Sequence, residues 1–208
     1  MTSINRNDAF TGLEAAIVLI AFVVVAAVFS YVVLGAGFFT TQKSQEVVHT
    51  GVAQASTNMA ILGEVYGDAS GIAQTNVRWG RIHTIIFSVG LSAGGSPLDM
   101  NRTTLVYSNA TILQNLDYAS LAMAPNCAAN PPATYQWAIC QKTNADTDAV
   151  LEPGERFTIW ANLTLPIVTT GGIIARDPFT IEVKPDVGAA LGITRTAPSA
   201  IDVMNLLY

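Results

Sequence analysis

The chain has 208 residues, of which 50% are hydrophobic and only 12% are charged, whereas an average soluble domain carries about 25% charged residues. A length near 200 residues suffices for one domain with a sizeable core and is too short for a large multidomain enzyme. The net charge of −5 leaves no basic stripe that could follow a phosphate backbone, which argues against nucleic acid as a partner.

The hydrophobic excess is concentrated near the N-terminus. The 25 residues from Ala15 to Phe39 include no charge, and 22 of them are hydrophobic. A helix of this length would measure about 37 Å, enough to cross the hydrocarbon layer of a bilayer. Because the segment is apolar on every side, it must be buried all round, in lipid or among copies of itself. Arg6 and the amino terminus precede it, which favours an orientation with the C-terminal part outside the cell.

The predicted helix continues beyond Phe39. A heptad-like seam with spacings of 4, 3, 4, 3 and 4 follows, made by Val48, Val52, Ala55, Met59, Leu62 and Tyr66. We therefore predict one helix over residues 10–67, with a stop at Gly67 or Gly71. A helix over most of this length would measure roughly 85 Å. Its first half would be apolar all round and its second half amphipathic.

From Arg78 onwards the hydrophobic period changes to two. Short alternating runs, separated by clusters of Pro, Gly, Asn and Asp, predict the strands of an antiparallel sandwich. These runs are 85–91, 104–107, 111–113, 136–139, 156–163, 179–183 and 188–195. The predicted fold class is α+β, with a long hydrophobic N-terminal helix followed by an all-β, immunoglobulin-like sandwich over residues 72–208.

Two patterns in the C-terminal part fit an extracellular location. Cys127 and Cys140 lie 13 positions apart with no His nearby, so the usual four-ligand metal set is lacking. A disulfide is favoured, with two unrelated buried thiols as the alternative. Three N-x-S/T sequons begin at Asn101, Asn109 and Asn162, and these would receive N-linked glycans if this part of the chain is external.

The sequence offers little catalytic chemistry. His49 and His83 belong to no nucleophile or metal motif, and phosphate-binding loops and hydrolase signatures do not occur. We therefore predict that the protein is not an enzyme.

The alternating carboxylates Asp146, Asp148 and Glu152 could offer oxygens to Ca²⁺. Leu151 and Phe157, however, replace the Gly and the final Glu of an EF-hand loop. An acidic turn leading into a strand is therefore the favoured interpretation.

Glu14 stands at the head of the apolar helix, where a lone carboxylate is costly unless it is paired or in contact with water. It would either lie in the first helical turn at a membrane surface, favoured by the helix dipole, or pair with an amino group. The second possibility arises if the chain is cut between Ala9 and Phe10. Glu14 would then be the fifth residue of the mature protein, near its own or a neighbour's new amino terminus.

Several segments of the chain resemble the archaellins, the flagellins of archaea, and they occur in the same order as in that family. Asn7-Asp8-Ala9, Phe10-Thr11-Gly12-Leu13-Glu14 and the apolar helix ending in Gly35-Ala36-Gly37-Phe38-Phe39 are similar to the class III signal sequence and N-terminal helix of that family. The segments 85–100, 148–159 and 185–198 are similar to archaellin blocks in the same order. The chain departs from the family pattern at Ala9, where Gly is more usual, and at Asp8, where Lys or Arg is common.

The resemblance implies that residues 1–9 are a signal peptide removed between Ala9 and Phe10 by a prepilin-peptidase-like enzyme, with Gly12 and Glu14 in the processing motif. The precursor would wait in the cytoplasmic membrane. The mature chain would polymerise with itself, or with other archaellins, through helix 10–67 into an extracellular archaellum filament.

A separate basal motor and platform would rotate this filament for swimming, and no cofactor would be required. An archaeal type IV adhesion pilin and a membrane-anchored extracellular binding protein remain the alternatives.

Overall fold

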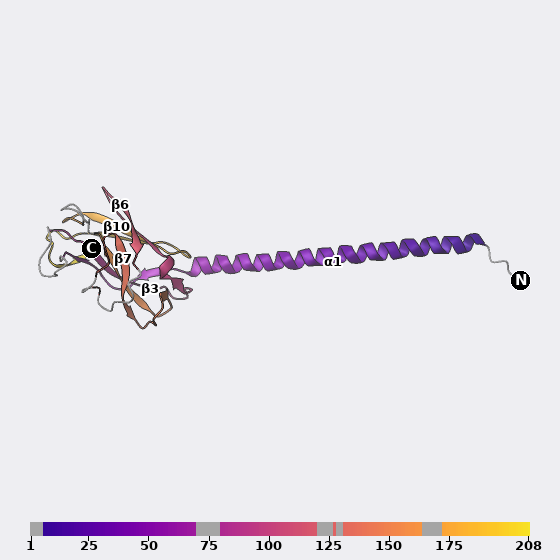
Figure 1. Ribbon diagram of the computed structural model, residues 1–208, viewed down its shortest axis with the longest axis horizontal. Helices are drawn as coiled ribbons and strands as arrows, with labels where there is room; N and C mark the ends of the chain where they lie inside the picture. The colour runs from indigo at the N-terminus through magenta and orange to yellow at the C-terminus, as the bar shows by residue number, and fades with distance from the viewer. Residues whose placement is uncertain (1–5, 70–79, 120–126, 128–130, 164–171) are drawn as a thin grey trace. The chain divides into compact units, whose positions relative to one another are not determined.

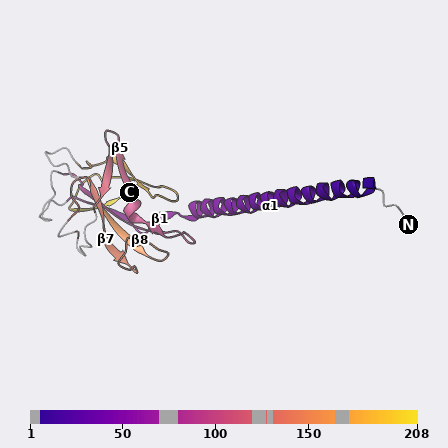
Figure 2. The same ribbon diagram turned by 45° about the vertical axis from the view of Figure 1, so that its right-hand side comes forward.

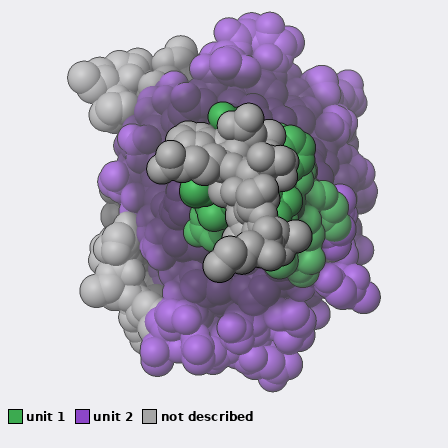
Figure 3. Space-filling view, turned by 90° about the vertical axis from the view of Figure 1, so that its right-hand side faces the viewer, with its two compact units in different colours: residues 1–51 green, residues 52–208 purple. Residues whose placement is uncertain are grey.

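The computed structural model describes residues 6–69, 80–119, 127, 131–163 and 172–208 of the chain (Figure 1). The chain divides into two compact units, residues 1–51 and residues 52–208, which Figure 3 colours separately. The described part of the first unit is entirely helical, and the second unit carries all the described strands.

The described residues of the first unit all belong to helix α1, which spans Arg6–Ser56 without interruption (Figure 1). Its 51 residues correspond to a length of about 76 Å, and they include no proline. The two hydroxyl groups that follow the apolar run donate to carbonyls one turn earlier: Thr40 to Ala36 at 2.8 Å and Thr41 to Gly37 at 2.9 Å. These bonds satisfy the hydroxyls within the helix.

The helix ends at Ser56, so the predicted helix over residues 10–67 is too long at its C-terminal end. Thr57 closes the last turn, since both its backbone N and its hydroxyl donate to the Ala53 carbonyl. The next residues form β1 (Met59–Ile61) and β2 (Val65–Asp68), which both pair with β3 (Thr84–Leu91). Cross-strand pairing therefore replaces the last part of the predicted seam.

Twelve strands are described in the second unit, and Figures 1 and 2 show several of them labelled from two directions. The remaining ones are β4 (Leu98–Asp99), β5 (Thr104–Asn109), β6 (Leu113–Tyr118), β7 (Gln136–Thr143), β8 (Val150–Leu151), β9 (Arg156–Asn162), β10 (Pro178–Lys184), β11 (Leu191–Thr196) and β12 (Met204–Leu207), with a short 3-10 helix η1 (Met100–Arg102) after β4. The predicted strand 111–113 covers the end of the turn between β5 and β6 and the first residue of β6, which continues to Tyr118. The strands β1, β2, β4, β8 and β12 were not predicted, and each has four residues or fewer.

The strands form a sandwich, as predicted. The main sheet has the order β11-β10-β5-β6-β7-β9-β3-β2-β12, with β1 also on β3, and β4 and β8 form a separate pair. Among the described strands every pairing is antiparallel except that between β6 and β7, which joins the two halves of the sandwich. Alternate side chains of both halves fill the core. Its largest fully buried members include Phe87, Trp137, Phe157, Phe179, Leu105 and Ile181.

The disulfide between Cys127 and Cys140 is confirmed, which excludes the alternative of two separate thiols. The two cysteines form a small buried cluster with Ala138, and Ala119 and Trp160 pack against it. This cluster is separate from the main core. The bond ties the residue at position 127 to strand β7, where closing a loop of this size stabilises a fold by about 3 kcal/mol.

Gly188 packs closely against Thr57, the first residue after the helix, and this contact can be tested by substitution. Gly188 has φ +102°, and a Cβ placed there would collide with the Thr57 carbonyl oxygen. We expect Gly188→Ala to cost about 2 kcal/mol or more, because it adds strain from a left-handed backbone to this collision. The control is Gly192→Ala in β11, since a Cβ at Gly192 would meet nothing within 4 Å.

The measurement is thermal unfolding of the full-length chain in detergent, followed by near-ultraviolet circular dichroism. Gly188→Ala should lower the midpoint by about 4–8 °C, while Gly192→Ala should leave it close to that of the native chain. Equal midpoints for the two variants would contradict this account of Gly188.

Candidate assembly surface

The candidate functional site is the surface of α1, because it is apolar and uncovered. Every described side chain from Gly12 to Val52 is exposed. Twenty of them are large hydrophobic residues, and Phe22 and Tyr31 are 76% and 80% exposed. Full burial of one such side chain is worth about 1.5–3 kcal/mol. The helix therefore needs an apolar environment that the chain alone does not supply.

The exposed apolar residues surround the helix instead of forming one stripe. Consecutive residues of an α-helix point about 100° apart, so three large side chains in a row cover the whole circumference. Val23, Val24 and Val25 form one such triplet, and Val32, Val33 and Leu34 form another. Within the described ranges, one helix is long and apolar enough to span a membrane, and it is this one, over Gly12–Ala55. The surface suits lipid or several neighbouring helices equally well.

Two shallow grooves on α1 interrupt this surface. One is lined by Glu14, Ala15, Val18, Leu19, Phe22 and Val23. The other is lined by Phe29, Ser30, Val33, Leu34, Gly37, Phe38 and Thr41. Helices pack by placing ridges of side chains into such grooves. The second groove was not singled out from the sequence, although the small residues Ser30 and Gly37 within the apolar run are the signal that marks it.

The predicted processing residues lie in the first turns of α1. Ala9 and Phe10 are helical, but their side chains fall outside the described set. Gly12 has open space where a Cβ would stand. Glu14 is exposed and borders the first groove, so its carboxylate is available to a group from another chain or to water.

The acidic stretch folds as a hydrogen-bonded turn. One Asp148 oxygen accepts from the Val150 amide at 2.8 Å, and one Asp146 oxygen accepts from the Asp148 amide at 3.0 Å. Glu155, which is buried, accepts from the amides of Glu152 and Asp146. In the part of the chain that the structure covers, no three His, Cys, Asp or Glu side chains gather as a metal site would need. Asp146, Asp148 and Glu152 are thus not brought together around a common point.

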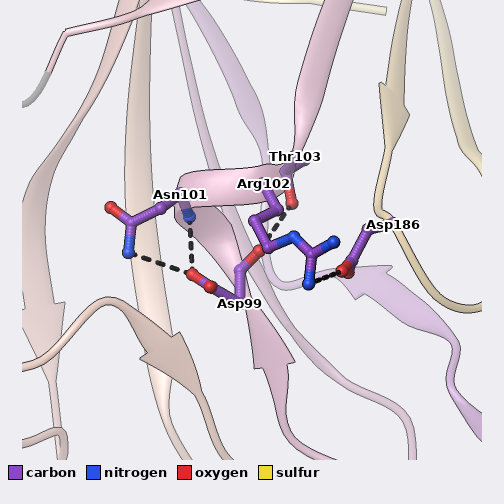
Figure 4. Close-up of polar contacts among 5 residues, drawn as sticks. All are labelled: Asp99, Asn101, Arg102, Thr103 and Asp186. Carbon is purple, nitrogen blue, oxygen red and sulfur yellow. Dashed lines mark hydrogen bonds and ion pairs between the residues drawn. The ribbon is translucent and has the colours of Figure 1, made fainter.

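The three sequon asparagines have different surroundings. Asn101 is exposed on η1, and its Nδ2 donates to Asp99 Oδ1 two residues earlier at 3.0 Å (Figure 4). The Thr103 hydroxyl of the same sequon lies inward and donates to the Asp99 carbonyl. An ion pair of 3.1 Å between Arg102 and Asp186 holds this segment against the loop after β10.

Asn109 and Asn162 are half-buried and bonded across the fold. Asn109 Nδ2 donates to Asp177 at 3.2 Å, and Asn162 Nδ2 donates to the Pro132 carbonyl at 2.6 Å. Burial, together with the Asp177 carboxylate, raises the pKa of the adjacent Tyr107 to about 12. Its phenol is therefore neutral at physiological pH.

An all-round apolar helix joined to a sandwich with its own core defines a class of protein: an anchored or assembling subunit whose helix is buried by lipid or by other helices. Comparisons with known proteins agree. Residues 9–195 match the sequence model of the archaeal-type flagellin family. The probable flagellin 1 of Archaeoglobus fulgidus is 40% identical, covering 100% of this chain and 98% of that protein. The probable flagellin 2 of the same organism is 44% identical over 91% of this chain and 89% of that protein.

A solved structure of the archaeal flagellum of Methanospirillum hungatei is also similar. It superposes with a TM-score of 0.66 at 33% sequence identity, covering 95% of this chain and 99% of that one. The chain belongs to the archaeal-type flagellin family. Its role is that of a structural subunit of the archaellum filament, as the resemblance implied.

The apolar surface of α1 predicts how a charge would affect assembly. Val24→Asp places a carboxylate in the middle of the apolar run, where burial should cost about 2–3 kcal/mol or more per subunit. Filaments should then be lost, while the outer domain still folds. The control is Ser44→Asp, which adds the same charge to the polar part of the helix.

Electron microscopy of sheared cells would measure filament formation. Resistance of the outer domain to trypsin would show whether that domain is folded. We expect filaments from Ser44→Asp and none from Val24→Asp. Filaments of normal length from the Val24 variant would show that this side chain is not buried in the assembly.

Proposed function

We propose that the chain is made as a precursor held in the cytoplasmic membrane by α1, and that the same helix then moves from lipid into the core of an extracellular filament. The observation that supports this is the exposure of large apolar side chains around the whole circumference of α1. Lipid and a core of packed helices are both apolar, so one helical conformation suits both environments. The sandwich domains would then form the outer layer.

We further propose that a prepilin-peptidase-like enzyme removes residues 1–9 by cutting between Ala9 and Phe10. This cut creates a positively charged amino group four residues before Glu14. A carboxylate that enters an apolar core needs a partner, and the new amino group of the same or a neighbouring subunit would supply one. Gly12 has no side chain, so the backbone of a second chain can approach this part of the helix closely.

Mass spectrometry of the N-terminus tests this proposal. Subunits from purified filaments should begin at Phe10, while membranes of cells that lack the peptidase should contain the chain with residues 1–9 attached. The unprocessed form in those membranes serves as the control, because it shows that the N-terminal peptide can be detected. Assembled subunits that begin at Met1 would contradict the proposed cut.

In this proposal the filament acts as a passive propeller. A separate basal motor and platform rotate it, and this chain itself catalyses no reaction and needs no cofactor. We propose an acidic turn at Asp146 and Asp148 in place of a calcium site, since one oxygen of each carboxylate accepts from a backbone amide of the same turn. The Val24→Asp and Ser44→Asp cells described above also report on motility: the first should not swim and the second should.

Of the three sequons, we propose Asn101 as the main site of an N-linked glycan. It is exposed, and among the described residues its side chain bonds to Asp99, two positions away. A sugar at Asn109 or Asn162 would instead have to fit beside a hydrogen bond that links distant parts of the fold. Glycans belong on the accessible surface of a secreted protein.

Glycopeptide mass spectrometry of native filaments would measure the occupancy of each site. We expect the highest occupancy at Asn101, and its complete loss at that site in an Asn101→Gln variant whose filaments still form. Occupancy concentrated at Asn162, with Asn101 unmodified, would overturn this choice.

A further inference from the structure

An apolar row crosses the outward face of one half of the sandwich. Strand register places Leu206 beside Tyr66, Tyr66 beside Ile86, Ile86 beside Trp160, and Trp160 beside Ala138. These residues alternate with the core residues of their strands, so they lie on the face away from the core. The disulfide cluster packs against Trp160 and Ala138 at one end of the row.

The other end of the row is uncovered. Tyr66 and Leu206 are exposed, and Met204 and Tyr208 extend the apolar surface along the same face of β12. We call these four residues, Tyr66, Met204, Leu206 and Tyr208, the Tyr66 patch. An apolar cluster of this kind on a monomer commonly marks an interaction site.

A second exposed apolar feature lies at the β5–β6 hairpin. Leu113 is 76% exposed, and its neighbour Ile112 is also exposed. The turn before them is fixed by hydrogen bonds, since Asn109 Oδ1 accepts from the amides of Thr111 and Ile112, and the Asn109 amide donates to the Ile112 carbonyl at 2.9 Å. We call Ile112 and Leu113 the Leu113 tip. It is a small exposed apolar pair at a hydrogen-bonded turn.

Charges beside the two surfaces have opposite signs. Arg195 lies two strands from the tip, since it pairs with Phe179, which pairs with Asn109. Arg176 is also near the tip, because it precedes Asp177, whose carboxylate accepts from Asn109. With two arginines and one carboxylate, the surroundings of the Leu113 tip carry a net positive charge.

The patch is flanked by carboxylates. Glu64 comes directly before β2 and Asp202 two residues before β12, and both are exposed. The ion pairs found among the described residues include none of Arg176, Arg195, Glu64 and Asp202, so these charges remain available to another molecule.

We propose that the Leu113 tip of one subunit docks on the Tyr66 patch of a neighbouring copy in the filament. The proposal rests on the role of the chain as a filament subunit. Tip and patch are different surfaces, so their contact is heterologous and can repeat without closing, as an open helical polymer requires. Two patches facing each other would instead close into a dimer. The contact is small, so it would set the register between outer domains, while the apolar helix supplies most of the assembly free energy.

Cysteine cross-linking in native filaments tests this contact. The chain has two cysteines, and both are in the disulfide, so introduced thiols are the only free ones. A chain that carries both Leu113→Cys and Leu206→Cys should give a ladder of dimers, trimers and higher species after mild oxidation. Either single variant should stay monomeric, because its own thiols do not meet. The matched control, Leu113→Cys with Ser199→Cys, places the second thiol at an exposed position outside the patch and should give no ladder.

The same gels show what would overturn the proposal. Intact filaments of the double variant without a ladder would do so, and so would dimers from Leu206→Cys alone, since these require patch-to-patch contact. A cross-link from Leu206→Cys to a Val52→Cys helix in place of the tip would assign the patch to a neighbouring α1.

If the double cysteine variant forms no filaments, a charge exchange tests the contact between the Leu113 tip and the Tyr66 patch instead. Arg176→Glu should lower the temperature at which filaments dissociate, and Glu64→Arg in the same chain should restore it. Failure of this rescue would overturn the tip-to-patch contact. The start of the mature chain at Phe10 is measured independently, so failure of this contact would leave the proposed processing and membrane route unaffected.

Discussion

The need to bury an all-round apolar helix is the constraint on which the rest of this protein depends. Twenty large hydrophobic side chains of α1 are exposed in the single chain, and at about 1.5–3 kcal/mol each their burial amounts to tens of kcal/mol. A single groove on a partner would cover only one side of the helix. Only lipid, or a bundle in which each helix is surrounded by others, covers the whole circumference. The residue pattern therefore restricts the helix to these two environments, and in the filament the second one buries it.

This constraint explains why the second unit has a complete core of its own. The helix is committed to partners outside the chain, so the strands must bury their hydrophobic side chains against one another. The two halves of the sandwich do this with Phe87, Trp137, Phe157 and Phe179, and the disulfide adds a separate buried cluster near β7. An outer domain with its own core can remain unchanged while the helix passes from one apolar environment to another.

The boundary between helix and strands shows two tendencies in competition. The heptad spacing through Met59, Leu62 and Tyr66 favours a longer helix, but the same segment also has apolar residues at strand spacing, Met59 with Ile61. Pairing with β3 decides in favour of strands, and Thr57 closes the helix at this point. Local periodicity could not reveal this outcome, because the pairing partner lies far away along the chain. For the same reason the short strands β4, β8 and β12 carried no clear signal, since a strand of two to four residues is defined by its neighbour.

The sequence by itself determined the features that depend on local composition. The helix across Ala15 to Phe39, most of the longer strands and the turn at Asp146 and Asp148 follow from which residues are apolar or polar and from their spacing, and the pairing of Cys127 with Cys140 could be inferred from the lack of other ligands. Tertiary structure alone decided which residues from distant strands share a surface. Register aligned Leu206 with Tyr66 and Ile86, and folding left Asn101 exposed while it bonded Asn109 and Asn162 across the domain. Such neighbours are set by long-range pairing, whereas the period of a single strand only says which of its two faces a residue occupies.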